Sequence, residues 1–449
     1  MYAKISVIVT LMVSVAFCTK AQTTLSPAIL SLEQCKSMAI ENNLTMKNAR
    51  YNTEASQLMS KYAFTKYFPD ISAGGMAYTT DKGALQYTLE IPLKELGLGF
   101  LGFGDVFSHN FGFFKKGTAA SLNFLQPLFM GGRIVYGNKL AHVGEEVARL
   151  EEDRTKDEIV LKVEEYYWKL ATLNAKRNTL VEVIAMLDTL TDYVGSYVEA
   201  GVATYNDLLQ VKLKRNQMAS NMIDLDNGRR LVKMALSQCI GYGAHGEIDV
   251  APSPDGKYLP EIPIEYYVNP DDALRNTSAY GLLNSAVKAA DIEHKLAVGE
   301  NLPVVAGGGG YFYEHLLGQN HTFGALYLTV AVPISDWWGG GYNIKKKKIE
   351  ARIARNRLED ASQLLIINMN NAWNDIVSAR EKISIALESI DQAKENLRLN
   401  KAYYEAGIVN LTDLLEAQAL YKSSNDEYTE SFGNFMIKTL QYRQATGQE

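Results

Sequence analysis

The chain carries one long internal duplication, and this repeat limits the folds that it can adopt more than any other feature. Residues 197–209 recur as residues 403–415, with the same Tyr, Glu, Ala, Gly, Asp and paired Leu positions and without a gap. At the same spacing, Pro127 in the first copy corresponds to Pro333 in the second. Repeats in solenoid proteins are about 20–50 residues long, and each copy here is several times longer. The chain is therefore two copies of one domain-sized unit.

Hydrophobic periodicity changes in the same order within each copy. A helical pattern ends shortly before a proline, Pro69 or Pro303, which would stop a helix. Period-two alternation follows and predicts a pair of strands; it is clearest at residues 324–333. A glycine cluster then precedes a very long helix and a shorter helix that returns alongside it. The expected ranges are helices at 32–64 and 268–299, strand pairs within 70–129 and 303–334, long helices at 134–200 and 344–406, and returning helices at 207–240 and 413–446.

The long helices carry apolar side chains at alternating spacings of three and four residues. At 1.5 Å per residue each helix would be roughly 90–100 Å long. A globular core cannot cover that length, whereas a coiled coil can. The residues that form these stripes are Leu180, Val183, Leu187, Leu190, Val194 and Tyr197 in the first copy, and Ile383, Ala386, Ile390, Ala393 and Leu397 in the second.

The N-terminal residues 1–21 have the features of a secretory signal peptide. Lys4 precedes an apolar stretch that is too short to cross a bilayer, and Ala21 supplies a small residue at the expected cleavage site. A short membrane anchor and a lipoprotein modified at Cys18 are the alternatives. After this leader we expect a first repeat at 22–240, an irregular equatorial linker at 241–267 and a second repeat at 268–449.

Composition excludes several classes of protein. The net charge of -6 and the pI near 5.7 argue against a nucleic-acid-binding protein. No second apolar run is long enough for a polytopic helical membrane protein. Cys35 and Cys239 are too few and too far apart for a disulfide framework or a metal site, and we expect two buried apolar side chains.

No catalytic, metal or cofactor site stands out. The six histidines lack the spacing of metal ligands. Glycines at 97, 99 and 102 match a dinucleotide fingerprint by letter, but no strand–helix–strand unit surrounds them. They belong to the segment 82–116, which only the first copy contains and which we expect to enlarge its strand pair or an extracellular loop.

Two strands in each copy make four per chain, which is too few to close a barrel in lipid. An open sheet edge in hydrocarbon leaves unpaired backbone groups that cost several kcal/mol each. Closure therefore requires several chains, and three would supply twelve strands. The long helices would continue such a barrel as a tube of coiled coils. This architecture predicts a conduit.

The chain resembles the TolC-like outer-membrane efflux proteins over nearly its whole mature length. The resemblance rests on the duplication, on the junction motif at 126–132, and on Gly201 and Gly407, each followed by Asp-Leu-Leu. It implies an α+β membrane protein that forms a homotrimer, with a twelve-stranded β-barrel continued by an α-helical periplasmic tunnel. It also implies the outer membrane of a Gram-negative bacterium, contact with outer-membrane lipid, no enzymatic activity and no cofactor. The implied partners are a periplasmic adaptor (membrane fusion protein) and an inner-membrane transporter.

The resemblance also assigns roles to residues at the hairpin tips. Asp413 and Glu416, with Asp207, would form an acidic ring at the periplasmic mouth, although Asp413 would also suit a helix cap. Val409 stands where the best-known members have an arginine, so the salt bridge that locks their closed mouth cannot form here. The residues expected to dock on an adaptor are Gly201, Val202, Asp207, Leu208, Gly407, Ile408, Asp413 and Leu414, for which a tight helical turn alone is the alternative.

Two further sets of residues lie where strands meet helices. Pro127, Gly131, Gly132 and Pro333 are expected at the strand-to-helix junctions. Lys345 to Lys348 open the second long helix just below the expected barrel rim. They would meet phosphate headgroups of the inner leaflet or form a solvated first turn.

Our leading functional hypothesis is a passive outer-membrane exit duct of a tripartite pump for small toxic compounds, opened by its adaptor. The duct of a type I protein secretion system is an alternative within the same fold. A periplasmic adaptor or structural coiled coil that never enters the membrane is an alternative of another class, although it would not explain the alternation at 324–333.

Overall fold

A computed structural model describes residues 28–81, 85–91, 107–113, 116–243, 246–251, 257–316 and 319–448. The chain forms two compact units, and boundaries between them fall within both long helices. The first contains Lys162–Leu259 and Ile383–Gly433 with the N-terminal part up to Ala39, and the second contains the remainder. Each unit takes residues from both copies of the duplication. The expected signal peptide with Cys18 and the glycines at 97–102 lie outside the described residues.

The helix expected before each strand pair is two helices rather than one. In the first copy α1 (Leu32–Asn42) and α2 (Leu44–Phe64) are separated by Asn43, whose side chain accepts a hydrogen bond from Thr45 N at 2.8 Å and caps α2. In the second copy the short helix α5 (Pro270–Ala273) precedes α6 (Ser278–Glu300). Thr277 caps α6 in the same way. Each break occupies only a few residues. The spacing of apolar side chains therefore predicted one continuous helix in each copy.

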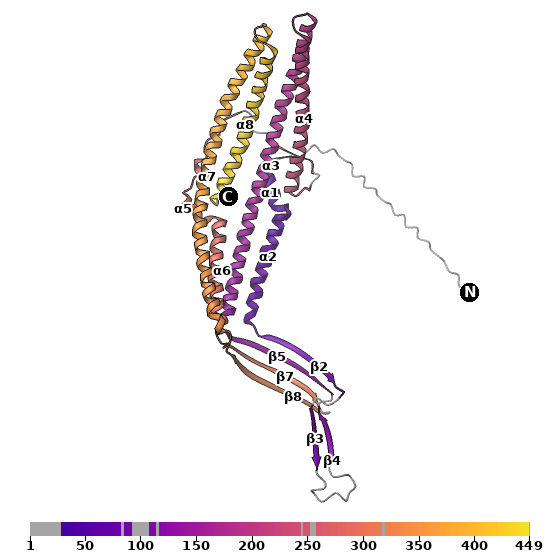
Figure 1. Cartoon of the computed structure of the whole chain (residues 1–449), viewed down its shortest axis with the longest axis vertical. Coiled ribbons are helices and arrows are strands. Elements are labelled where there is room, and N and C mark those ends of the chain that lie inside the picture. The colour runs from indigo at the N-terminus through magenta and orange to yellow at the C-terminus, as the bar shows by residue number, and fades with distance from the viewer. Residues whose placement is uncertain are drawn as a thin grey trace, which may run out of the picture. The chain divides into compact units, whose positions relative to one another are not determined.

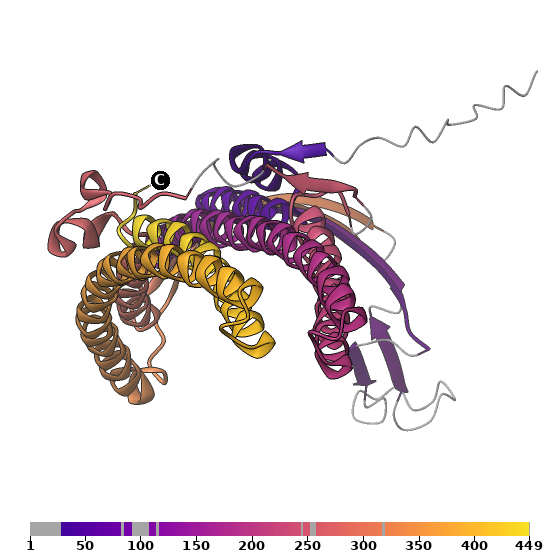
Figure 2. The same cartoon turned by 90° about the horizontal axis from the view of Figure 1, so that it is seen from above.

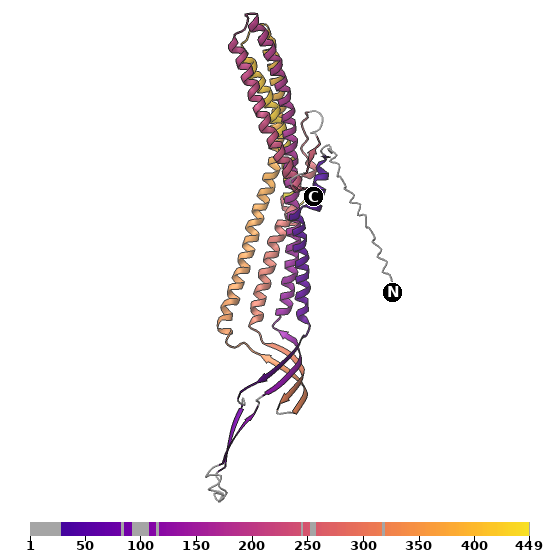
Figure 3. The same cartoon turned by 90° about the vertical axis from the view of Figure 1, so that its right-hand side faces the viewer.

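Four strands of the second unit form one antiparallel sheet in the order β2-β5-β7-β8 (Figures 1 and 3). They are β2 (Asp70–Thr79), β5 (Lys116–Met130), β7 (Val304–Leu316) and β8 (Gln319–Ala331). The central pairing joins the two copies, because β5 pairs with β7 over almost its whole length. Within the described part of the chain, the outer edges of β2 and β8 have no neighbouring strand.

The expected strand pair of the first copy is β2 with β5, and the first copy contains two further strands beside it. Part of the extra segment 82–116 forms a separate hairpin, β3 (Leu85–Ile91) with β4 (Phe107–Phe113). Figure 1 shows this hairpin continuing away from the end of the four-stranded sheet. The extra segment therefore extends the strand pair, which is one of its two expected roles.

The long helices are α3 (Arg133–Glu199) and α7 (Trp337–Glu405). α7 begins seven residues before the expected position and runs through the glycines at 339–341. A side chain on Gly340 would lie 1.6 Å from Asn301 Oδ1, so glycine lets the helix begin against the end of α6. The Trp337 indole also donates a hydrogen bond to Asn301 O at 2.9 Å. The glycine cluster is thus part of the helix, where it serves close packing.

The returning helices α4 (Tyr205–Cys239) and α8 (Leu411–Ala445) complete a hairpin in each copy. The predicted apolar stripes are buried: Leu180, Val183, Leu187 and Val194 on α3, and Ile383, Ala386, Ile390 and Ala393 on α7. Coiled-coil packing therefore explains how such long helices obtain a core. No helix in the described residues is both long and apolar enough to cross a membrane.

Two short strands lie in the first compact unit, and the sequence patterns did not predict them. β1 (Ala28–Leu30) pairs in parallel with β6 (Ile248–Val250), which lies within the expected irregular linker (Figure 2). Three residues are too few for periodicity to distinguish a strand from a loop.

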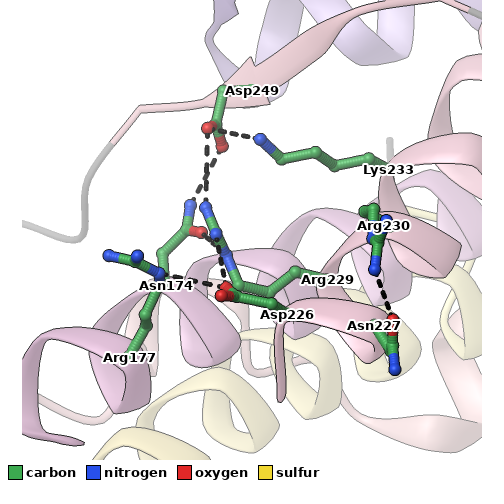
Figure 4. A network of polar contacts seen from close by, with 8 residues as sticks. All are labelled: Asn174, Arg177, Asp226, Asn227, Arg229, Arg230, Lys233 and Asp249. Carbon is green, nitrogen blue, oxygen red and sulfur yellow. Dashed lines mark hydrogen bonds and ion pairs between the residues drawn. The ribbon is translucent and has the colours of Figure 1, made fainter. Parts of the chain in front are cut away.

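A network of polar side chains ties β6 to the helices α3 and α4 (Figure 4). Asp249 accepts hydrogen bonds from Lys233 Nζ at 2.6 Å and from Asn174 Nδ2 at 3.0 Å. Asn174 in turn accepts from Arg229 Nε at 2.7 Å, and Arg229 also donates to Asp226 at 3.2 Å. Burial alone would raise the pKa of Asp249, but its hydrogen bonds outweigh this effect and hold the pKa below its ordinary value.

We expect Asp249→Asn to destabilise the fold around β6 by about 2 kcal/mol at pH 7, because a hydrogen-bonded carboxylate is lost. A lowered pKa in the folded state means that Asp249 stabilises above its unfolded pKa of about 4 and that this contribution is lost as the pH falls below it. The variant should therefore lose less stability than the wild type between pH 5 and pH 2. Chemical denaturation followed by circular dichroism measures both effects.

Asp192→Asn is the matched control, because Asp192 is an exposed carboxylate on α3 outside this network. It should leave stability at pH 7 unchanged. Equal stability of the two variants would show that the network does not hold β6.

Candidate functional site

Both helix hairpins of the first compact unit reverse direction at a glycine. Gly201 has φ +76° and Gly407 has φ +70°, a left-handed conformation that other residues adopt at a cost. The Val202 N–H donates to Tyr197 O at 2.9 Å, and the Ile408 N–H donates to Tyr403 O at 2.8 Å. These are the hydrogen bonds of a Schellman motif, which satisfies the last carbonyls of a helix. The two copies therefore end their long helices by the same device.

The acidic residue after each tip caps the returning helix. Thr204 and Asp207 form a capping box: Asp207 N donates to Thr204 Oγ1 at 3.2 Å, and Thr204 N donates to Asp207 Oδ2 at 3.0 Å. Asn410 and Asp413 exchange the equivalent bonds, at 3.0 Å from Asp413 N and 3.3 Å from Asn410 N. Both carboxylates are half-buried, whereas Glu416, one turn further along α8, is exposed.

The predicted docking residues differ in their exposure. Val202 and Ile408 are exposed to 73% and 70%, beside the exposed glycines. Leu414 is buried and Leu208 packs against the core behind the tips. Only the first pair therefore offers apolar surface to a partner. The core behind the tips consists of Leu180, Val183, Leu187, Val194, Val211, Met218 and Leu411.

A tyrosine cluster lies just behind the tips and was not predicted from the sequence. The rings of Tyr193 and Tyr197 are 4.4 Å apart, and their hydroxyls share a hydrogen bond that raises the pKa of Tyr193 to about 12. Burial, and then the charge of Asp207, raise the pKa of Tyr404. Asp207 thus has an aromatic hydroxyl in its neighbourhood, in a protein where Val409 supplies no cation. The sequence signal for the cluster is weak, because Tyr193 and Tyr404 correspond to Leu399 and Val198 in the other copy.

A groove of about 220 Å³ opens between the two hairpins at the level of these tyrosines. Its walls combine apolar side chains with one cation and one carboxylate. They include Leu190, Tyr193, Leu397, Lys401, Tyr404 and Glu405.

The strand-to-helix junctions depend on close backbone contact in the second unit. Gly131 (φ +63°) and Gly132 (φ +77°) turn the chain from β5 into α3. A side chain on Gly131 would lie 2.2 Å from Gly299 O, so this site accepts only glycine. Pro127 lies where the register between β5 and β7 shifts, and half-buried Pro333 follows β8. The structure thus places all four predicted residues at the strand-to-helix junctions.

The four-stranded sheet has two chemically different faces. Residues directly opposite each other in the register share a face. One face is apolar and exposed, including Leu326 (84%), Leu328 (65%) and Ile71 (67%). The opposite face carries the polar side chains of Ser72, Asn123, Ser121, Glu314 and His321, for which we call it the polar face, together with larger apolar ones such as Met76 and Phe323. A sheet of this kind suits a boundary between lipid and water.

Other candidate chemistry is not supported by the geometry. In the part of the chain that the structure describes, no three His, Cys, Asp or Glu residues are grouped to hold a metal ion. Cys35 and Cys239 are buried, as expected. Burial is the main reason that the pKa of each thiol is raised, that of Cys35 to about 11, which leaves them weak nucleophiles and ligands.

We expect Gly407→Ala to destabilise the second hairpin by about 1–2 kcal/mol, because alanine must adopt the left-handed conformation at the tip. No atom lies within 4 Å of the place that the new methyl group would occupy, so the cost is conformational rather than steric. Hydrogen exchange at residues 400–415 measures the change.

Gly228→Ala provides the opposite control. Gly228 lies inside α4 with open space around it, so alanine should stabilise that helix by about 0.5–1 kcal/mol. A Gly407→Ala variant with unchanged protection at the tip would contradict the conformational argument.

Comparison with solved structures finds the same fold in outer-membrane channels. The outer-membrane channel OprN matches with a TM-score of 0.78 at 14% identity, over 93% of this chain and 90% of that one. CmeC of Campylobacter jejuni matches with a TM-score of 0.77 at 15% identity, over 93% and 85%. MtrE of Neisseria gonorrhoeae, solved in its open state, matches with a TM-score of 0.72 at 15% identity, over 93% and 89%.

A search by sequence against the curated proteins gives no significant match. The family model described as outer membrane efflux protein matches residues 36–242 and 281–448, which is most of the chain and includes both hairpins. The matched segments leave out part of the linker between the copies. This chain belongs to the outer membrane efflux protein family.

Proposed function

We propose that this outer-membrane protein is the exit duct of a tripartite pump, through which small toxic compounds pass passively to the outside. The observation that supports this most directly is the four-stranded sheet, which has one apolar face and two open edges and is joined to helices of 67 and 69 residues. The outward apolar face would contact lipid. The polar face would line a water-filled passage.

The open edges support assembly from several chains. A strand that crosses a membrane needs about 9–11 residues, and the four strands have 10 to 15. In lipid, the unpaired N–H and C=O groups along β2 and β8 would each cost several kcal/mol. Pairing β2 of one chain with β8 of the next removes both edges. Three chains would give the twelve-stranded barrel of a homotrimer.

The helical hairpins support a tunnel that extends into the periplasm. Each long helix would reach about 100 Å at 1.5 Å per residue. At the tips, Val202 and Ile408 present exposed apolar side chains next to exposed backbone. A periplasmic adaptor, bound in turn to an inner-membrane transporter, is the partner that such tips would dock on, and it would open the duct.

We propose that Glu416 and Asp413 form an acidic ring at the mouth. Asp413 also caps α8 through its hydrogen bonds with Asn410. Exposed Glu416 would contribute the more accessible carboxylate. Three chains would place six carboxylates around one opening, which favours cations.

Purified protein reconstituted into planar lipid bilayers tests the duct directly. We expect discrete conductance steps, because a closed barrel holds a continuous aqueous path. A protein that separates with the soluble fraction and gives no conductance would contradict the proposal.

We expect Glu416→Gln to reduce the preference for cations, and Asp413→Asn with Glu416→Gln to reduce it further. Reversal potentials in a salt gradient measure this preference. Asp192→Asn is the control, because it removes an exposed carboxylate that lies on α3 and not on α8. Unchanged selectivity in the double variant would remove both residues from the mouth.

A further inference from the structure

The first turns of α7 carry a cluster of aromatic and basic side chains that the proposed duct does not by itself explain. We call this surface the α7 collar; it consists of Trp338, Tyr342, Lys345, Lys346 and Lys348. Trp338 is 82% exposed and Tyr342 is 78% exposed, and all three lysines are at least partly exposed. Two large exposed aromatic side chains one helical turn apart form a contiguous patch, and such patches mark interaction surfaces.

Contacts on α7 define which side of the helix faces the bundle. The Trp337 indole and Gly340 contact Asn301, and Lys347 Nζ lies 2.8 Å from Glu293 of α6. Residues 338, 342, 345 and 349 are spaced by four, three and four, so they form a stripe on the other side of the helix. Trp338, Tyr342 and Lys345 therefore point away from their own chain, and Lys346 and Lys348 are exposed on either side of this stripe.

The collar lysines lack strong partners within the chain. Lys346 Nζ is 3.7 Å from Glu350, which already pairs with Lys347 at 3.0 Å. Among the described residues no ion pair reaches Lys345 or Lys348. Like charges three residues apart on a helix destabilise it. Of the three collar lysines, only Lys346 therefore has an ion pair within the described part of the chain, and it is a long one.

The duplication supplies an internal comparison. The positions equivalent to 345–348 in the first copy are Lys139, Leu140, Ala141 and His142 at the start of α3. α3 is as long as α7 to within two residues and needs no lysine cluster at this point. The cluster is thus a property of the second copy and not a requirement of the shared helix.

The order of side chains along the chain matches a membrane interface. The apolar face of β8 ends in Leu328 and Val330, which are 65% and 61% exposed, and α7 begins six residues after β8 ends. Exposed aromatic residues also mark the other strand-to-helix junctions, at Phe68 before β2 and Phe129 near the end of β5. Along the chain, apolar side chains are followed by aromatic and then by basic ones. This order matches the layers of a membrane from the hydrocarbon, through the interface, to the lipid phosphates.

We propose that the α7 collar binds the phosphate headgroups of anionic phospholipid in the periplasmic leaflet, a role that rests on the proposed duct. Trp338 and Tyr342 lie at the level of the glycerol esters, and Lys345, Lys346 and Lys348 contact the phosphates. Lys345 follows Trp338 by seven residues, about 10 Å along the helix, and its side chain can extend back toward the interface. The collar would fix the depth of the duct in the membrane.

Brominated lipids test this in the full-length protein, because bromine on an acyl chain quenches a nearby tryptophan. The protein is reconstituted in mixtures of phosphatidylglycerol and phosphatidylethanolamine in which one lipid or the other is brominated. The Trp338→Phe variant gives the signal of the other three tryptophans. We expect Trp338 to be quenched with a preference for phosphatidylglycerol on the order of tenfold. Lys345→Gln with Lys346→Gln and Lys348→Gln should remove the preference but keep the quenching.

Lys382→Gln with Lys394→Gln and Lys401→Gln is the matched control, since it removes the same charge from exposed lysines further along α7. It should keep the preference for phosphatidylglycerol. Equal quenching by both lipids in the wild type, or a preference retained by the collar variant, would overturn the proposal. Normal conductance without quenching of Trp338 would place the collar against another chain and overturn it while leaving the duct intact. Absence of both signals would contradict the duct itself.

Discussion

Backbone hydrogen bonding at the two edges of the sheet is the constraint on which the rest of this molecule depends. β2 and β8 each carry a row of N–H and C=O groups that no described strand of the same chain satisfies. In water such edges are a liability, and in hydrocarbon they are prohibitive. In lipid, a chain with these edges would need partner strands, and the proposed pairing with copies of itself would supply them. Assembly, a closed wall and an enclosed passage would follow from that one requirement.

The connection between sheet and helices explains how a narrow sheet supports helices of such length. At Gly131 any side chain would overlap the backbone of Gly299, and at Gly340 it would meet the end of the Asn301 side chain. These contacts fix where each long helix begins. Further along, buried apolar stripes and polar links such as Asp249 with Lys233 hold the helices in register. The tips then reverse the chain with a glycine and a capping carboxylate in both copies.

Periodicity and duplication predicted most of the fold, because long amphipathic elements repeat a signal many times. The stripe from Leu180 to Val194 is buried as its spacing predicts, and the period-two pattern at 324–333 corresponds to most of β8. Short elements escaped prediction, since β1 and β6 have three residues each and the break at Asn43 is one side-chain cap. The early start of α7 was missed because glycines usually end helices, whereas here they allow close packing.

The candidate site was predicted less completely, since exposure depends on partners distant in sequence. Leu208 and Leu414 resemble docking residues by position, yet they pack inward behind the tips. In the tyrosine cluster, Tyr193 and Tyr197 lie one turn apart on α3, and only Tyr404 comes from a segment about two hundred residues away in the chain. In contrast, the cap formed by Asp413 is local and could be read from the sequence.

Cross-linking between the sheet edges tests the central claim most directly. A variant with Ser72→Cys on β2 and Ala325→Cys on β8 places one thiol on each edge strand, both on the polar face. Treatment of the reconstituted protein with a short thiol cross-linker should give covalent dimers and trimers and nothing larger, because three chains close the ring. A product that stays monomeric, or a ladder that continues beyond three chains, would contradict the account.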